Sequence, residues 1–291
     1  MTQISTMKKT TKYVGIAALA ITGIVTLSLM GAEAEATEHD NASEGIVFPE
    51  GCSKLVFSDE FDYNGLPDST KWTWEEGYVR NGELQYYTKG LNAWCEDSHL
   101  IIEARADSNM VINGVVCPVT SASIKTKGHA AWNDCYVEVC AKLPSFRGSW
   151  PAIWMMPEYD IYGDWPRSGE IDIMEHVGYE PQNIHFAAHS ERYNHMRGIQ
   201  KNSVCPAPDC TGKFHTYGLR RTPDRITWYY DGEEKFSLDK ESDADWTSWP
   251  FDTDFHLILN LAVGGGWGGQ QGVDMAAMPA RFEVDYVRIF Q

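Results

Sequence analysis

Residues 169–176 read GEIDIMEH, a stretch in which apolar and acidic side chains alternate and then slip by one position. Its isoleucines alternate with Glu170 and Asp172 as on a pleated strand, where residues two apart share a face. Glu175 lies five positions after Glu170 and would point to the opposite face of a regular strand. A β-bulge inserts one extra residue and resets the alternation. A bulge near residues 173–174 therefore predicts that all three carboxylates face one side.

Three like charges on one strand face repel each other, so they do not stabilise the fold. An exposed acidic edge or a row of surface ion pairs would not be flanked by Ile171, Ile173, Met174 and Val177. Crowded carboxylates push their pKa values apart, so that one stays protonated while another is ionised. Glycoside hydrolysis requires such an acid and nucleophile on one surface.

The separation of the outer carboxylates bears on the stereochemistry. A gap of about 5–5.5 Å is typical of retaining enzymes, and a wider gap leaves room for the water of inverting enzymes. A bulge shortens the path between Glu170 and Glu175, which favours retention. Glu170 is then the nucleophile and Glu175 the acid and later the base, with a protonated Asp172 between them. The spacing alone does not distinguish the two outer roles.

Further stretches along the chain have the pattern of β-strands, and clusters of Gly, Pro, Asn and Asp separate them. No stretch of twelve or more residues has helical periodicity. Many short strands with turn-rich connections indicate an all-β sandwich, jelly roll or barrel without repeats. The strand patterns are KLVFSDEF (54–61), HLIIEARAD (99–107), YVEVCAKL (136–143), IDIMEHV (171–177), RITWYYDG (225–232), HLILNLAV (256–263) and FEVDYVRIF (282–290).

The first 36 residues have the pattern of a secretory signal peptide. A basic start precedes an apolar run from Val14 to Met30, and Ala34 and Ala36 form an A-x-A site. An uncleaved membrane anchor is the alternative, because the apolar run is slightly long. We therefore expect a signal peptide over 1–36, a short tether over 37–52, one catalytic domain over 53–291 and a secreted product that is extracellular or periplasmic.

The composition narrows the range of partners. The net charge of −17 makes nucleic acid and anionic membranes poor partners. The 11 Trp, 14 Tyr and 11 Phe residues can fill a core or form flat apolar platforms. We expect a monomer with a neutral polysaccharide substrate, no nucleic acid partner and no membrane contact after signal cleavage.

All seven cysteines follow the signal pattern, where disulfides are permitted. Because the number is odd, at least one thiol is free or pairs with another chain. Cys205 and Cys210 bracket the turn-rich PAPD, and a bond between them is as plausible as its absence. Cys135 and Cys140 would lie about 16 Å apart on a straight strand, which excludes a bond.

Four blocks together resemble glycoside hydrolase family 16, in particular the laminarinases. They are WPAIWMMP (150–157), SGEIDIMEHVG (168–178), PFDTDFHLILNLAVGGGWGG (250–269) and VDYVRIFQ (284–291), and the resemblance runs from Leu55 to Gln291. It implies a concanavalin A-like β-jelly-roll of two curved antiparallel sheets with a glycan cleft on the concave face. It also implies retention, with Glu170 as nucleophile, Glu175 as acid/base and Asp172 assisting. The extra residue in the motif is typical of laminarinases, whereas the compact E-x-D-x-E marks typical bacterial lichenases.

Aromatic residues around the motif are candidates for stacking on sugar C–H faces. Trp165 and Trp150 have the best claims to be such platforms, and Trp267 lies in a glycine-rich loop. We assign Trp154 to the core. A Trp taken singly is more often a core residue than a platform.

The resemblance also supplies polar candidates. RNGELQYY matches a laminarinase segment whose Asn contacts the sugar, which points to Asn81 with Arg80 and Glu83 nearby, although Gly82 replaces a residue that is often polar. His189 matches a family histidine near the cleavage point. Asn194 and His195 are weaker candidates, since a lone His is usually structural.

A metal is not required for catalysis by two carboxylates. The family often binds one calcium ion on the convex side, through an Asp of the last strand and backbone carbonyls. Asp285 matches that Asp, and a solvated Asp is the alternative. We expect no required cofactor and a possible structural calcium site at Asp285.

Three functions are compatible with these residues. The first is an endo-β-1,3-glucanase acting on laminarin-like and also mixed-linkage β-1,3-1,4-glucan. The second is a hydrolase of agar, carrageenan or porphyran, which would need cations in its cleft; Arg80, Arg167 and Arg192 lie near the motif in sequence. The third is a noncatalytic glucan-binding protein, which typically lacks the carboxylates that this chain retains.

Overall fold

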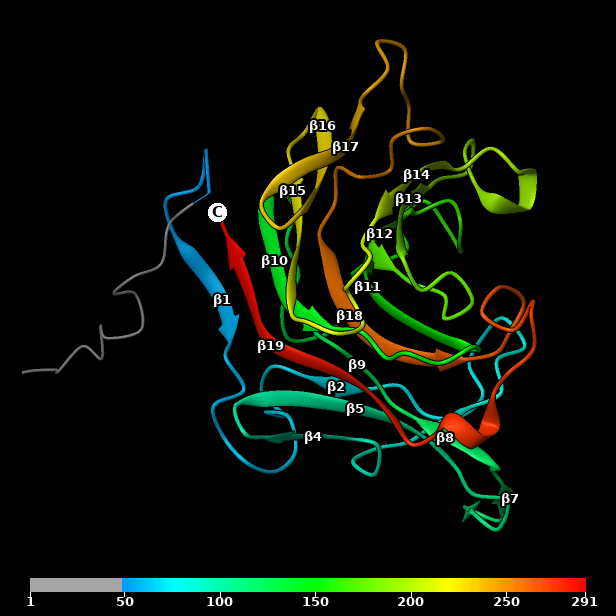
Figure 1. Cartoon of the computed structure of the whole chain (residues 1–291). Coiled ribbons are helices and arrows are strands. Elements are labelled where there is room, and N and C mark those ends of the chain that lie inside the picture. The colour runs from blue at the N-terminus through cyan, green and yellow to red at the C-terminus, as the bar shows by residue number, and fades with distance from the viewer. Residues whose placement is uncertain (1–48) are drawn as a thin grey trace, which may run out of the picture. The chain divides into compact units, whose positions relative to one another are not determined.

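The structure describes residues 49–291 in a computed structural model, and this part forms one unit whose regular secondary structure is almost entirely β-strand (Figure 1). Two large sheets hold most strands, and β6 (Val111–Ile112) pairs with β7 (Val115–Val116) in a separate hairpin. The only helices within the described range are two short 3₁₀ turns, η1 (His195–Arg197) and η2 (Met275–Ala277). The absence of long helical patterns in the sequence is thus confirmed for this range.

The first sheet has ten strands in the order β17-β16-β15-β10-β19-β5-β8-β3, with β1 joined to β19 and β4 joined to β5. All its pairs are antiparallel except β3–β8, which is parallel. Its strands are β1 (Leu55–Asp59), β3 (Tyr86–Tyr87), β4 (Ala93–Glu96), β5 (His99–Ala106), β8 (Val119–Ser121), β10 (Cys135–Lys142), β15 (His215–Arg221), β16 (Arg225–Tyr230), β17 (Glu233–Asp239) and β19 (Ala280–Phe290).

The second sheet has seven antiparallel strands in the order β14-β13-β12-β11-β18-β9-β2. Its strands are β2 (Thr73–Trp74), β9 (Ser123–Lys125), β11 (Ser149–Pro157), β12 (Glu170–Glu175), β13 (Asn183–His189), β14 (Lys201–Pro206) and β18 (Phe255–Val263). Each of the seven strand patterns found in the sequence overlaps one of the observed strands, and the bounds differ by up to two residues at the strand starts. Two open sheets rather than a closed barrel confirm the jelly-roll sandwich.

The core lies between the two sheets, where β18 contacts β5 and β12 contacts β15. Strand β18 illustrates the alternation, because Phe255, Leu257 and Leu259 belong to this core while His256 and Asn260 point to the other face. All nine residues of β18 are buried, so its outward-facing side chains are shielded from solvent as well. This second face is where polar side chains gather.

The acidic strand β12 carries the expected bulge. Against β11, Met174 pairs with Ile153 and Asp172 pairs with Trp154, which leaves Ile173 as an extra residue. The register with β13 shifts between Asp172 and Glu175 as well. Ile173 and Met174 are both fully buried in the core, so the bulge places two consecutive apolar side chains on the inner face. The prediction of a bulge at this position is confirmed.

All seven cysteines are free thiols in this structure. Cys135 and Cys140 both lie on β10 and are not bonded to each other, and the bond considered for Cys205 and Cys210 is not formed. The Cys205 thiol contacts the carbonyl of Pro206, whereas the Cys210 thiol contacts that of Pro181. The two sulfur atoms therefore face different carbonyl groups, although both residues are buried beside the PAPD turn.

The signal peptide expected over 1–36, and most of the tether expected over 37–52, lie outside the described residues. The first described segment joins the sheet at once, because the backbone N–H groups of Ser53 and Lys54 both donate to the carbonyl of Gln291. No helix between residues 49 and 291 has the length and apolar character of a membrane span.

Candidate active site

A cleft of about 830 Å³ lies on the outer face of the seven-stranded sheet. Its floor comes from β14, β13, β12, β11 and β18, so the cleft crosses the strands, and loops form its walls. Eleven site candidates from the sequence line it: Arg80, Asn81, Glu83, Trp150, Trp165, Glu170, Asp172, Glu175, His189, His195 and Trp267. The fold thus brings together segments that lie almost 190 residues apart in the chain.

The three carboxylates stand in the middle of this cleft because of the bulge in β12. Glu170 pairs across strands with His189, and Glu175 pairs with His185. Asp172 lies between the two and is almost fully buried, with 1% of its surface exposed. All three side chains line the same cleft, as the slipped alternation predicted.

Burial and mutual repulsion change the ionisation of these groups. Burial, with the charge of Asp172 as the second cause, raises the pKa of Glu170 to about 8. Burial also raises the pKa of Asp172. The pKa of Glu175 lies well above its usual range because of burial first and the charges of Asp172 and Glu170 second. The three groups therefore share protons near neutral pH instead of all being ionised.

Neighbouring side chains with N–H groups limit how far the pKa values of these carboxyls rise. The Nε2 atom of His189 lies 3.3 Å from Oδ2 of Asp172. The indole N–H of Trp150 donates to Oε1 of Glu175 at 3.0 Å, which favours the ionised form of this carboxylate. The indole of Trp165 acts in the same direction on the pKa of Glu170. The cleft thus holds two outer carboxylates in different surroundings, with a tryptophan beside each.

The aromatic residues form two groups around the acids. Trp150 meets Trp267 edge-on, with ring centroids 5.5 Å apart. Trp165 lies 6.1 Å from His189 and 5.0 Å from His195 between ring centroids. Trp150, Trp165 and Trp267 are thus placed where a sugar can reach them, which is compatible with their predicted role as platforms.

Trp154 is buried as expected, yet it does not belong to the main core. It packs with Ala152 and Ile258 in a small cluster on the cleft side, and its ring lines the cleft floor. The guanidinium of Arg80 lies 5.0 Å above the ring. Arg80 therefore covers the indole face that a sugar would otherwise use.

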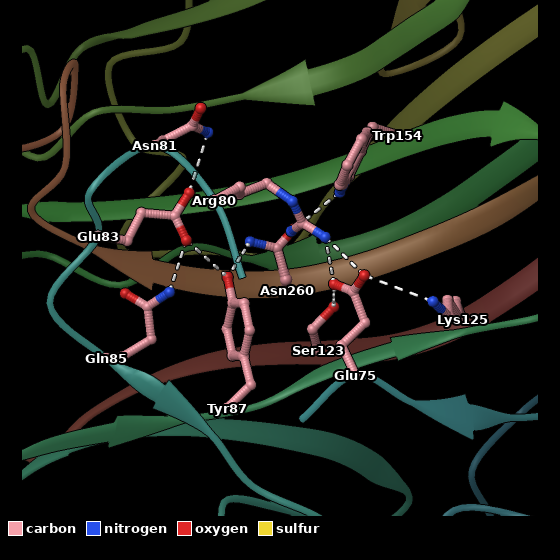
Figure 2. A network of polar contacts seen from close by, with 10 residues as sticks. All are labelled: Glu75, Arg80, Asn81, Glu83, Gln85, Tyr87, Ser123, Lys125, Trp154 and Asn260. Carbon is pink, nitrogen blue, oxygen red and sulfur yellow. Dashed lines mark hydrogen bonds and ion pairs between the residues drawn. The ribbon is translucent and has the colours of Figure 1, made fainter. Parts of the chain in front are cut away.

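A network of polar side chains fills the Arg80 end of the cleft, and Figure 2 shows its members. Glu83 accepts hydrogen bonds from Asn81 at 3.0 Å and from Gln85 at 2.6 Å. Burial raises the pKa of Glu83, which is only 9% exposed. Asn81 has a φ of 56°, a left-handed conformation that Asn tolerates better than most residues. The three candidates from RNGELQYY thus form one connected wall.

Four polar cleft residues were missed by sequence reasoning: His185, Gln200, Asn202 and Asn260. A period of two in NIHFAAH places His185 on the face of His189, and the same rule in HLILNLAV separates Asn260 from the core leucines. That signal was available for these two. Gln200 and Asn202 carried none, because only the pairing of β13 with β14 brings them to the cleft.

The structure separates the weaker polar candidates of the sequence analysis into residues inside and outside the cleft. His195 lines the cleft, whereas Asn194 is 2% exposed, and its amide donates to the carbonyls of Ser190 and Glu191. This geometry is that of a structural turn residue. Arg167 and Arg192 are outside the cleft, since Arg167 pairs with Glu191 and Arg192 with the acids Glu241 and Asp245.

One group of side chains in the described range has the spacing of a metal site, namely Glu170, Asp172 and His189. These groups already pair with each other, as the contact between His189 and Asp172 shows. Asp285 lies on β19 next to a register shift and faces the Cys140 thiol, whose pKa it raises along with burial. Within residues 49–291, Asp285 belongs to no such group, so a calcium ion there would need backbone carbonyls, as hard cations accept.

The arrangement can support displacement at a sugar carbon. One buried carboxyl with a high pKa can donate a proton, and another can attack once it is ionised. Both face an open, aromatic cleft that crosses several strands and can hold a chain of sugars. Of the cleft-lining residues, Arg80 is the only Lys or Arg, so this part of the protein gives little attraction to a polyanion.

The comparisons with known proteins agree with this geometry. The sequence profile of glycosyl hydrolases family 16 matches residues 66–288. The chain is 46% identical to a β-glucanase of Rhodothermus marinus, over 82% of this chain and 85% of that protein. The structure of the laminarinase from Rhodothermus marinus has a TM-score of 0.78 and covers 82% of this chain and 97% of its own. The structure of SCLam, a non-specific endo-β-1,3(4)-glucanase, has a TM-score of 0.79 at 43% identity and covers 84% of this chain and 93% of its own.

Proposed function

The chain belongs to glycosyl hydrolases family 16, and from this premise we propose that it cleaves β-1,3-glucan chains internally with retention of configuration. The observation that carries the proposal is that the bulge in β12 directs three carboxylates toward the same open cleft. The similarity to a laminarinase and to a non-specific endo-β-1,3(4)-glucanase supports laminarin-like and mixed-linkage β-glucan as substrates.

In this mechanism Glu170 attacks the anomeric carbon and Glu175 protonates the leaving oxygen. A glycosyl ester on Glu170 results, and Glu175 then removes a proton from the water that hydrolyses it. The raised pKa of Glu175 keeps its proton available for the first step. Asp172 shares a proton with Glu170, and Nε2 of His189 lies 3.3 Å from its Oδ2.

The substrate is held by aromatic and polar side chains on both sides of the acids. Trp150 and Trp267 form one wall, and Trp165 with His195 forms another. Sugar C–H faces stack on such rings, while the hydroxyl groups need polar partners such as Asn81 and Arg80. An open cleft of this kind binds the interior of a chain, which favours endo cleavage into oligosaccharides.

Two alternatives are less well supported. A hydrolase of sulfated galactans would need free cations, but the charge of Arg80 is already paired with Glu75, at 2.5 Å, and Arg167 and Arg192 are outside the cleft. A noncatalytic glucan-binding protein would not require three carboxylates with perturbed pKa values in one cleft.

The remaining expectations are part of the same proposal. Hydrolysis by this pair requires no cofactor, and a calcium ion at Asp285 would contribute to stability only. Chelation with EDTA should therefore leave the activity unchanged. We also propose a monomer that is exported after removal of residues 1–36, so the amino terminus of the exported protein should begin near residue 37.

The decisive experiment compares products from laminarin, barley β-glucan, agarose and κ-carrageenan side by side. We expect short oligosaccharides from laminarin and barley β-glucan, and a β-anomer as the first product in proton NMR spectra. The Glu175→Gln variant serves as the control for contaminating activity. Rapid release of oligosaccharides from κ-carrageenan, with none from laminarin, would overturn the glucanase assignment.

A further inference from the structure

The Arg80 end of the cleft is held by a carboxylate that does not face the substrate. Glu75 follows β2, and its side chain is 10% exposed. One terminal nitrogen of Arg80, Nη2, donates to both carboxylate oxygens of Glu75, at 2.6 and 2.5 Å. Glu75 does not line the cleft, whereas Arg80 does.

The position of Glu75 is fixed from the opposite side by β9. The Ser123 hydroxyl donates to its Oε2 at 2.8 Å, and Nζ of Lys125 lies 3.4 Å from its Oε1. Its backbone N–H also donates to the carbonyl of Ser123. Burial alone would raise the pKa of Glu75, but these cations and hydroxyl groups outweigh it and hold the pKa below its usual range. The carboxylate is therefore charged and rigidly placed.

The same contacts fix the orientation of the Arg80 guanidinium. With Nη2 engaged by Glu75, the guanidinium lies 5.0 Å above the Trp154 ring. Figure 2 shows Arg80 between Glu75 and Trp154, with Glu83 and its partners on the far side. Within residues 49–291, the Nε and Nη1 atoms of Arg80 donate to no protein acceptor, so these donors remain available at the cleft surface.

A second chain of hydrogen bonds holds the floor beneath Arg80. The indole of Trp154 donates to Oδ1 of Asn260 at 2.7 Å, and the Asn260 amide donates to the Tyr87 hydroxyl at 2.9 Å. The Tyr87 hydroxyl in turn lies 3.4 Å from Oε2 of Glu83. The ring under the guanidinium is thus fixed independently of Glu75.

We propose that Glu75 is a positioning residue for glucan binding: with Lys125 and Ser123 it holds Arg80 over the Trp154 ring, so that the two free donors of Arg80 meet the sugar hydroxyls without reorganisation. The proposal rests on the glucanase function and concerns one end of the same cleft. Preorganisation improves binding because the side-chain entropy of Arg80 is lost during folding instead of during binding. Since the Arg80 end is away from the bulged acids, its effect should fall on KM.

The test measures the kinetics of Glu75→Gln on laminarin and on a series of laminari-oligosaccharides. Loss of the charged hydrogen bond should raise KM about tenfold on long substrates and change kcat less than about twofold. The cleavage positions in laminarihexaose should also shift, because the Arg80 end no longer holds one sugar firmly. A merely structural role would lower the folded fraction, and hence the apparent kcat, without this split.

The neighbouring Glu76→Gln is the matched control. Glu76 is a surface carboxylate that pairs with Lys89 and does not line the cleft. Its substitution changes the net charge by the same amount and should leave KM and the cleavage pattern unchanged. If Glu75→Gln folds poorly, Glu75→Asp keeps the buried charge but shortens its reach to Arg80, and it should show the same effect on KM.

Double variants reveal whether Glu75 acts through Arg80. The combination of Glu75→Gln with Arg80→Ala should raise KM no further than Arg80→Ala alone, since both changes remove one interaction. Multiplying effects, or an unchanged KM in folded Glu75→Gln and Glu75→Asp, would overturn the proposal. A wild-type enzyme without activity on any β-glucan would overturn the proposed function, which is a distinct result.

Discussion

The single hydrogen bond from Trp150 to Glu175 can be tested through the pH dependence of the reaction. The indole N–H donates to Oε1 of Glu175 at 3.0 Å and stabilises the ionised carboxylate. The Trp150→Phe variant removes this donor and retains an aromatic ring. The ionised form then loses stabilisation, so the pKa of Glu175, already raised by burial, should rise further.

The size of this shift follows from the energy of the bond. A hydrogen bond to a charged group contributes about 1.5–3 kcal/mol, and one pKa unit corresponds to about 1.4 kcal/mol. Glu175 is incompletely buried, so water replaces part of the lost bond. We therefore expect an increase of about one pKa unit.

The direction of the effect on activity follows from the role of the acid. Glu175 must be protonated to assist the leaving group, so a higher pKa extends the active range toward alkaline pH. The alkaline limb of kcat/KM on laminari-oligosaccharides should move up by about one pH unit in Trp150→Phe. The Trp267→Phe variant is the control, because it alters the same aromatic wall without touching this bond. An alkaline limb that stays in place or moves down in Trp150→Phe would refute the reasoning.

The other predictions concern the acids, a buried histidine and the platform. Glu170→Gln and Glu175→Gln should each lower the rate of hydrolysis by more than about 10³-fold, and Asp172→Asn should lower it less. Azide should partly restore a Glu170→Ala variant and give a product of inverted configuration. Full activity of Glu175→Gln would exclude Glu175 as the acid. Glu170→Gln should also raise Tm by a few degrees at pH 7. The pKa of Glu170 is raised to about 8 in the folded protein, so this carboxyl destabilises the fold at any pH above its pKa in the unfolded chain. Thermal scans at pH 4 should therefore show no gain in Tm. Burial lowers the pKa of His176 to about 4, so between pH 6.5 and 4 the histidine is protonated in the unfolded chain but not in the folded one. The free energy of unfolding should therefore drop by about 1.4 kcal/mol per pH unit as the pH falls across this window. In His176→Gln, denaturant titrations should show a shallower dependence of this free energy on pH. Trp165→Ala should weaken turnover of laminarin far more than it lowers Tm, and the platform role would be lost if the variant unfolded with unchanged activity in its folded fraction.

Much of the site could be predicted because its signals are local. The slip in GEIDIMEH specified the bulge, since one side of β12 must pack in the core while three carboxylates avoid it. Alternating patterns located seven of the strands for the same reason, and the family blocks identified the residues near the acids. These inferences need only the period of two and the physics of burial.

Other features depended on contacts between distant segments. The bond considered for Cys205 and Cys210 does not form, because the two thiols face different carbonyls. Arg167 and Arg192 are close to the motif in sequence, yet their acidic partners hold them outside the cleft. Sequence distance therefore did not indicate spatial distance in the loops.

The sequence by itself determined seven of the strands, the bulge and the three acids, because each follows from side chains that are neighbours along one strand. Only the tertiary structure decided that Glu75 holds Arg80 over Trp154 and that His185 stands opposite Glu175. These pairs join different strands and loops, and their geometry depends on strand register and loop packing. Register is fixed by the burial of whole sheet faces, which is a property of the assembled sandwich and not of any one segment.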